Sequence, residues 1–256
     1  MDKIIATVFG FSVIIAATSL GAALALFFKN DVSDRLNAAF SGLSAGIMIA
    51  ASVWSLLLPA IERSAHLNSF AFLPATLGFL LGGAFLVIID RLLPDNLGSE
   101  ILSEKKRSAE LFIAITVHNI PEGLAVGFAF GAANLGGGAQ AVSAALGLAI
   151  GIAVQNFPEG AAVSLPLKRA TGSKVKSFLF GVASGAVEPV AAVAGYFLAF
   201  MLTFIQPYLL AFSAGAMIYV VICDLIPSAN AGGYKSGTWA CMIGFAVMMA
   251  LDVALG

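Results

Sequence analysis

Two similar segments of this sequence place metal-ligating side chains inside apolar surroundings. They occupy residues 118–123 (HNIPEG) and 155–160 (QNFPEG). Positions four apart share one face of a helix, so His118 stands with Glu122, and Gln155 stands with Glu159. Imidazole nitrogen, amide oxygen and carboxylate together suit divalent cations such as Zn²⁺, Fe²⁺, Mn²⁺ or Cd²⁺. The repeated motif therefore predicts a metal site.

The remaining motif positions favour the same interpretation. Asn119 and Asn156 each lie one residue further along, toward a neighbouring helix face. The proline in each motif frees the carbonyl four residues earlier, which predicts a kink, and the glycine after the glutamate permits a close approach. A single motif would fit a kinked helix with an internal polar pair equally well. Two copies favour a metal site, because burying several ionisable groups without a ligand is costly.

Other polar residues in apolar segments extend this candidate site. Glu188 offers a third carboxylate, and Pro189 predicts a kink beside it. Met48 and Ser55 share one face of an earlier segment, where a thioether ligand and a pathway hydroxyl compete with ordinary packing and back-bonding. Asp224 precedes Pro227 and is either a pathway carboxylate or an interfacial aspartate.

The elements that position these residues are transmembrane helices. Of the 256 residues 60% are hydrophobic and 11% are charged, far from the roughly 25% charged content of soluble domains. The formal net charge of −1 gives no indication of a nucleic-acid partner. We expect an all-α, polytopic membrane protein with one transmembrane domain over residues 1–256. Its eight apolar segments cover roughly 4–28, 38–60, 70–93, 110–132, 139–166, 175–203, 208–227 and 237–255.

Basic residues predict the orientation of this bundle. With both termini outside, the inner loops carry eleven basic residues and the outer side carries two, Lys3 and Arg63, which accounts for all 13. Positively charged loops stay in the cytoplasm, so this topology is preferred over its inverse. Because consecutive spans run antiparallel, the two motifs are expected to meet as an inverted pair near the middle of the bilayer.

The eight segments and the paired HNxPEG and QNxPEG motifs resemble the ZIP (Zrt-, Irt-like) family of divalent metal-ion transporters, especially its bacterial branch. The resemblance implies a multi-pass protein of the plasma membrane, a bacterial inner membrane, with homodimers and two helix groups that slide past each other. It implies no cofactor, and Zn²⁺, or Fe²⁺, Mn²⁺ or Cd²⁺, as transported substrate. By matching position it implies a first site of Met48, His118, Glu122, Gln155 and Glu159, and an adjacent site of Asn119, Asn156 and Glu188 that shares both motif glutamates.

Two departures from the family pattern bear on selectivity. Many members carry His in place of Gln155, and Asp or Glu in place of Asn156, so this chain has a weaker ligand and less negative charge. Two other functions compete with metal uptake. An intramembrane metal enzyme would need further ligand clusters such as HExxH, and a proton-driven carrier would use the glutamates as relays. We predict a transporter and no enzyme.

Overall fold

The computed structural model describes residues 2–27, 33–92, 104–136, 138–201 and 203–255. For several positions inside helices only the backbone is described, and Asp90 and His118 are two of them. Helices and short connections make up the described part, and no strand occurs in it. The predicted all-α class is confirmed.

The first three apolar segments form α1 (Lys3–Phe27), α2 (Asp34–Ala51) and α4 (Phe72–Leu92). Ser33 caps α2 by accepting a hydrogen bond from the backbone N–H of Leu36. The second span continues from α2 through a π-helical turn, η1 (Ser52–Leu57), into α3 (Leu58–Arg63). A 3₁₀ segment, η2 (Ala65–Phe70), then leads into α4.

The two motifs lie near the middle of the two longest helices, α5 (Glu104–Gly136) and α6 (Ala139–Thr171), each of 33 residues. Both helices continue without a break through Pro121 and Pro158. The prolines therefore do not divide these spans. The helix α6 ends at Gly172, whose φ of 66° is the left-handed conformation that favours glycine at this position.

The sixth span is divided beside Glu188. It consists of α7 (Lys174–Gly185) and α8 (Val187–Met201), separated at Ala186. Pro189 falls in the first turn of α8, where its missing N–H costs no helical hydrogen bond. The predicted bend at this proline therefore appears as a break just before it, and Glu188 stands in the first turn of the new helix.

The last two spans follow a short 3₁₀ turn, η4 (Thr203–Ile205). The seventh repeats the design of the second, with a π-helical turn before a proline-started helix. The seventh span consists of α9 (Gln206–Val220), η5 (Val221–Leu225) and α10 (Ile226–Asn230). The 3₁₀ turn η6 (Ala231–Gly233) then leads to the eighth span, α11 (Lys235–Leu255).

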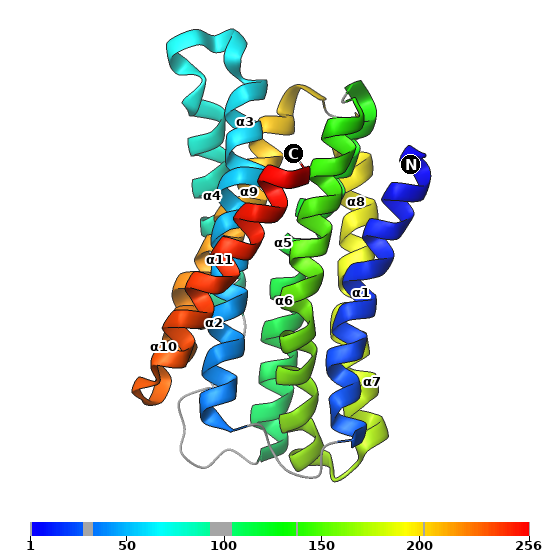
Figure 1. Cartoon of the computed structure of the whole chain (residues 1–256), viewed down its shortest axis with the longest axis vertical. Coiled ribbons are helices and arrows are strands. Elements are labelled where there is room, and N and C mark those ends of the chain that lie inside the picture. Colours follow the sequence, from blue (N-terminus) through cyan, green and yellow to red (C-terminus); the bar gives the residue numbers. More distant parts are fainter. Residues whose placement is uncertain (1, 28–32, 93–103, 137, 202, 256) are drawn as a thin grey trace.

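Seven of these helical runs are long and apolar enough to cross a membrane within the described residues. The remaining predicted segment, 110–132, lies in α5, which stands among the others in the same bundle (Figure 1). The start of α1 and the end of α11 lie at the same end of the bundle (Figure 1), as an even number of crossings requires.

Glycines join the helices in four close pairs: α1 with α6, α5 with α8, α2 with α11, and α4 with α9. A Cβ added at Gly21 would lie 1.8 Å from the Phe157 carbonyl oxygen, and one at Gly42 would lie 2.1 Å from the Gly237 carbonyl oxygen. Gly151 instead faces the flexible Met248 side chain. Backbone-to-backbone contact therefore fixes α5 and α6, which carry the motifs, against α8 and α1.

Candidate metal-binding site

The two motifs are brought together by the contact between α5 and α6. Four of their polar side chains are fully enclosed: Asn119, Glu122, Gln155 and Asn156 are each 0 or 1% exposed. Glu188 on α8 is 0% exposed and joins them. The backbone of His118 lies on the same helix as Glu122, while its side chain is outside the described part of the structure.

Asn119 is oriented by the neighbouring helix α7. Its amide nitrogen Nδ2 donates to the Ser184 carbonyl oxygen at 3.1 Å and lies 3.5 Å from the Ser184 hydroxyl. Its carbonyl oxygen Oδ1 is buried and has no hydrogen-bond partner among the described residues. The arrangement therefore leaves an oriented amide oxygen available to a cation.

Asn156 is oriented by α1 and α8 instead. Its Nδ2 donates to the backbone carbonyl of Ile14 at 3.3 Å and to the Glu188 carboxylate. The other Glu188 oxygen accepts a hydrogen bond of 3.0 Å from the Thr18 hydroxyl. As with Asn119, the Oδ1 atom of Asn156 is buried without a partner in the described part of the chain.

Glu122 and Gln155 hold the least satisfied atoms of the site. The Glu122 oxygen Oε2 and both amide atoms of Gln155 are buried without hydrogen-bond partners among the described residues. The Glu122 and Gln155 side chains are close enough to interact electrostatically, although they do not form a hydrogen bond of normal geometry. Orphaned buried polar atoms are costly, and a bound cation would satisfy the oxygens among them.

Three carboxylates share this region. Glu122 lies within range of the charges of Glu159 and Glu188, and Glu188 is also within range of Glu159. Glu159 is only partly buried, unlike the other two. Like charges enclosed together repel strongly unless protons or cations compensate them. In the described residues no three His, Cys, Asp or Glu side chains form a metal-binding group, so a bound ion would also need amide oxygens, a thioether or the His118 imidazole.

Met48 and Ser55 occupy different surroundings on the second span. Met48 is 0% exposed on α2 in the core that includes Ile152 of α6. Ser55 lies in η1 and donates a hydrogen bond of 2.6 Å to Asp252 on α11. Ser55 is thus engaged with a carboxylate of another span.

Asp224 does not share the enclosed position of the motif glutamates. It is exposed, in the π-helical turn η5, and so is its neighbour Cys223. The structure therefore brings together the predicted residues on α5, α6 and α8 and places Met48 in the core on α2. It sets Ser55 and Asp224 apart in the π-helical turns.

Sequence reasoning missed Ile14 and Ser184, which orient the two asparagine amides, and Thr18, which donates to the Glu188 carboxylate. It also missed a second repeat. Residues 44–49 read SAGIMI and residues 213–218 read SAGAMI, which aligns Met217 with Met48, and both methionines are 0% exposed. Comparing the second and seventh spans would have found Met217. Thr18 could not have been found in this way, because a threonine in an apolar helix usually donates only to a backbone carbonyl of its own helix.

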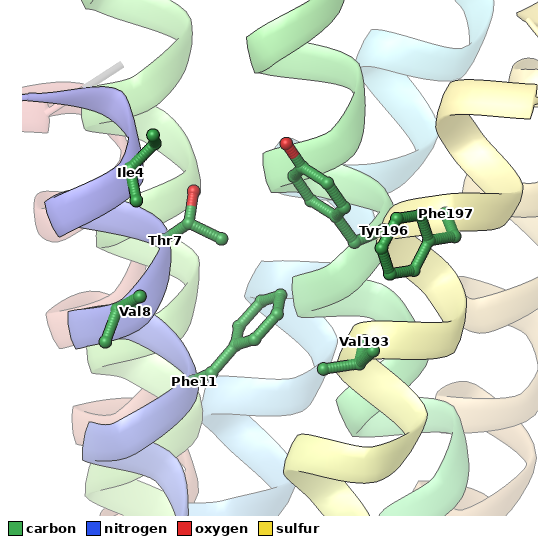
Figure 2. Close-up of a pocket in the computed structure, with 7 residues that line it drawn as sticks. All are labelled: Ile4, Thr7, Val8, Phe11, Val193, Tyr196 and Phe197. Carbon is green, nitrogen blue, oxygen red and sulfur yellow. The ribbon is translucent and has the colours of Figure 1, made fainter.

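A separate cavity of about 290 Å³ lies between α1 and α8 and contains none of the predicted metal ligands. Figure 2 shows apolar side chains from both helices around it, with the hydroxyls of Thr7 and Tyr196 as its polar atoms. A site without a charged group is unsuited to a metal ion. The motif cluster is therefore the candidate metal site.

Comparison with known proteins agrees with this geometry. Residues 94–252 match the family model described as ZIP zinc transporter. The chain is 38% identical to "Zinc transporter ZIP11" of Homo sapiens, over 93% of this chain and 94% of that protein. It is 36% identical to "Zinc transporter GufA" of Myxococcus xanthus (94% and 95%) and 33% identical to "Zinc transporter ZupT" of Corynebacterium aurimucosum (96% and 97%). A match over most of the chain, centred on helices that enclose carboxylates and amide oxygens, shows that this chain belongs to the ZIP zinc transporter family.

Proposed function

We propose that this chain carries divalent metal cations across a membrane and into the cytoplasm, with Zn²⁺ first and Fe²⁺, Mn²⁺ and Cd²⁺ as competitors. One observation carries the proposal: Glu122, Gln155, Asn119 and Asn156 all present buried oxygens without hydrogen-bond partners in the described structure. A membrane protein gains nothing from such a cluster unless an ion satisfies it.

We assign the ion to the region between α5 and α6. Glu122 and Gln155 are its central ligands, because their atoms are the least satisfied. We assign Glu159 and Met48 as further ligands, together with His118 because of its position in the motif, and Asn119, Asn156 and Glu188 complete the polar wall. Ser55 and Asp224 belong to the pathway on either side, since both lie in π-helical turns outside the enclosed cluster.

The same proposal includes the architecture implied by the resemblance. Residues 1–256 form one transmembrane domain with both termini outside, in a bacterial inner membrane, and the functional unit is a homodimer. The common location of the start of α1 and the end of α11 supports the even number of crossings (Figure 1). The charge distribution of the loops supports the direction.

Transport is preferred over catalysis and over carriage of an organic substrate. An intramembrane hydrolase or oxidase would need additional ligands beside an open substrate space, and the described cavity lies elsewhere and is apolar. A proton-driven carrier would use the same glutamates without metal. Transport of a substrate that depends on a proton gradient and not on added metal would favour that second function.

The test is uptake of radiolabelled Zn²⁺ into proteoliposomes. Wild type is compared with Glu122→Gln and His118→Ala, at matched incorporation, with Asp2→Asn as a control because Asp2 is an exposed carboxylate outside the apolar segments. We expect saturable uptake by wild type and the control, and loss of it in both site variants. Well-folded wild type that transports none of the four metals would overturn the proposal.

A further inference from the structure

We propose that Asn156, Glu188 and Thr18 form a hydrogen-bonded triad that takes the place of a second cation, so that the site loads one ion at a time. This inference rests on the proposed function and concerns its stoichiometry. The family resemblance implies that Asn156 and Glu188 are two ligands of an adjacent site. The contacts of these two side chains lead to a different assignment.

The orientation of the Asn156 amide follows from its neighbours. Its Nδ2 faces a carboxylate oxygen of Glu188 and the backbone carbonyl of Ile14, and neither of these atoms can donate a hydrogen bond when the carboxylate is ionised. The NH₂ group must therefore point toward them. The amide thus presents its positive end to Glu188, where a cation would otherwise stand.

The second Glu188 oxygen is held by Thr18. The Thr18 hydroxyl lies 3.0 Å from Oε1 of Glu188 and 3.2 Å from the Ile14 carbonyl oxygen. Thr18 is fixed in place by close packing, because a Cβ added at Gly185 would lie 2.7 Å from the Thr18 Cβ. Both oxygens of Glu188 are therefore engaged by the protein, whereas Oε2 of Glu122 has no partner among the described residues.

Charge balance leads to the same stoichiometry. The region holds three carboxylates, of Glu122, Glu159 and Glu188, and one of them is already stabilised by hydrogen bonds from Asn156 and Thr18. One divalent cation neutralises the two that remain. An aspartate in place of Asn156 would remove the donor and bring the total to four carboxylates, which two divalent cations would neutralise.

The experiment measures Cd²⁺ bound per chain by equilibrium dialysis of the purified full chain in detergent micelles, with metal and protein quantified separately. Four proteins form a cycle: wild type, Asn156→Asp, Glu188→Gln and the double variant. We expect two ions per chain for Asn156→Asp and one ion for wild type, Glu188→Gln and the double variant. The second ion requires both the new aspartate and Glu188. A role for Glu188 in folding alone would affect both backgrounds equally.

The outcomes separate this inference from the proposed function. Two ions on wild type, falling to one in Glu188→Gln, would overturn the triad and leave metal transport intact. One ion on a folded Asn156→Asp protein would also overturn it. Should that variant fail to elute as a single species, Glu188→Gln decides alone: affinity within about threefold of wild type supports the triad, and a loss beyond about tenfold shows that Glu188 is a ligand. No Cd²⁺ on wild type would count against the proposed function itself.

Discussion

The two copies of the motif have nearly the same sequence but unlike surroundings. In α5, Asn119 donates to uncharged groups of Ser184, and Glu122 is enclosed. In α6, Asn156 donates to a carboxylate, and Glu159 is partly exposed. The neighbouring helices cause the difference, because Asn119 contacts α7, whereas Asn156 contacts α1 and α8. A sequence repeat therefore places equivalent groups together, while the fold gives them different surroundings.

The strongest test of this asymmetry compares the two glutamates. Glu122→Gln removes the charge from an enclosed, unsatisfied ligand, so we expect Zn²⁺ uptake to fall by about 100-fold or more, equivalent to about 3–5 kcal/mol. Glu159→Gln changes a partly exposed group, and we expect uptake to fall by about tenfold. Initial uptake rates in proteoliposomes measure both. Equal losses would show that the partial exposure of Glu159 has no bearing on its role.

The two asparagines should differ in their effect on stability. Asn156→Ala leaves the buried Glu188 carboxylate with one hydrogen-bond partner fewer. We expect the free energy of unfolding to fall by about 3 kcal/mol. Asn119→Ala removes the partner of an uncharged carbonyl and a hydroxyl, both of Ser184. We expect the free energy of unfolding to fall by about 1–2 kcal/mol. Denaturant titration of the metal-free protein in micelles gives both free energies of unfolding. A larger effect at Asn119 would contradict the environments described for the two amides.

The motif glycines offer a comparison in which the copies should agree. A Cβ at Gly123 would lie 2.3 Å from the Glu188 carbonyl oxygen, and one at Gly160 would lie 2.0 Å from that of Thr18. We expect Gly123→Ala and Gly160→Ala each to destabilise by about 1–3 kcal/mol, because backbone must move. Gly136, with nothing within 4 Å of an added Cβ, is the matched control. Gly136→Ala should leave the melting temperature unchanged or slightly raised.

The smallest effect is expected at Thr18. Thr18→Val keeps the shape of the side chain but removes the hydroxyl that donates to Glu188. We expect the free energy of unfolding to fall by about 1 kcal/mol. Thr18→Ser retains the hydroxyl and should preserve the affinity for Cd²⁺. A melting temperature that falls equally in both variants would indicate that the methyl group of Thr18, and not its hydroxyl, stabilises the contact between α1 and α8.

Much of this fold follows from hydrophobicity alone. The predicted segments 4–28 and 237–255 correspond to α1 (Lys3–Phe27) and α11 (Lys235–Leu255) within a few residues. A span must be apolar over about 20 residues, so its presence is evident in the sequence. Two pairs of glycines with the same spacing of four residues have different surroundings: Gly42 and Gly46 meet backbone of α11, whereas Gly147 and Gly151 meet mainly side chains. Spacing alone cannot distinguish these two situations.

The residues of the candidate site could be predicted from the sequence, whereas their hydrogen bonds could not. The chemistry of Glu122, Gln155, Asn119 and Asn156 could be inferred from residue type and spacing. The hydrogen-bond partners in the site come from distant positions: Ser184 lies 65 positions from Asn119, and Thr18 lies 170 positions from Glu188. Only the packing of α1 against α8 and of α7 against α5 brings these groups together, and no local pattern specifies it.

The π-helical turns of the second and seventh spans bear on how this protein tolerates changes in length. From the serine of SAG to the proline, one repeat covers residues 44–59 and the other 213–227, and η1 and η5 lie just before each proline. A π turn is where a helix accommodates an additional residue without shifting its two ends. Relatives that gain or lose one residue in these spans are therefore expected to do so here, because a deletion elsewhere would rotate the following side chains away from their neighbours.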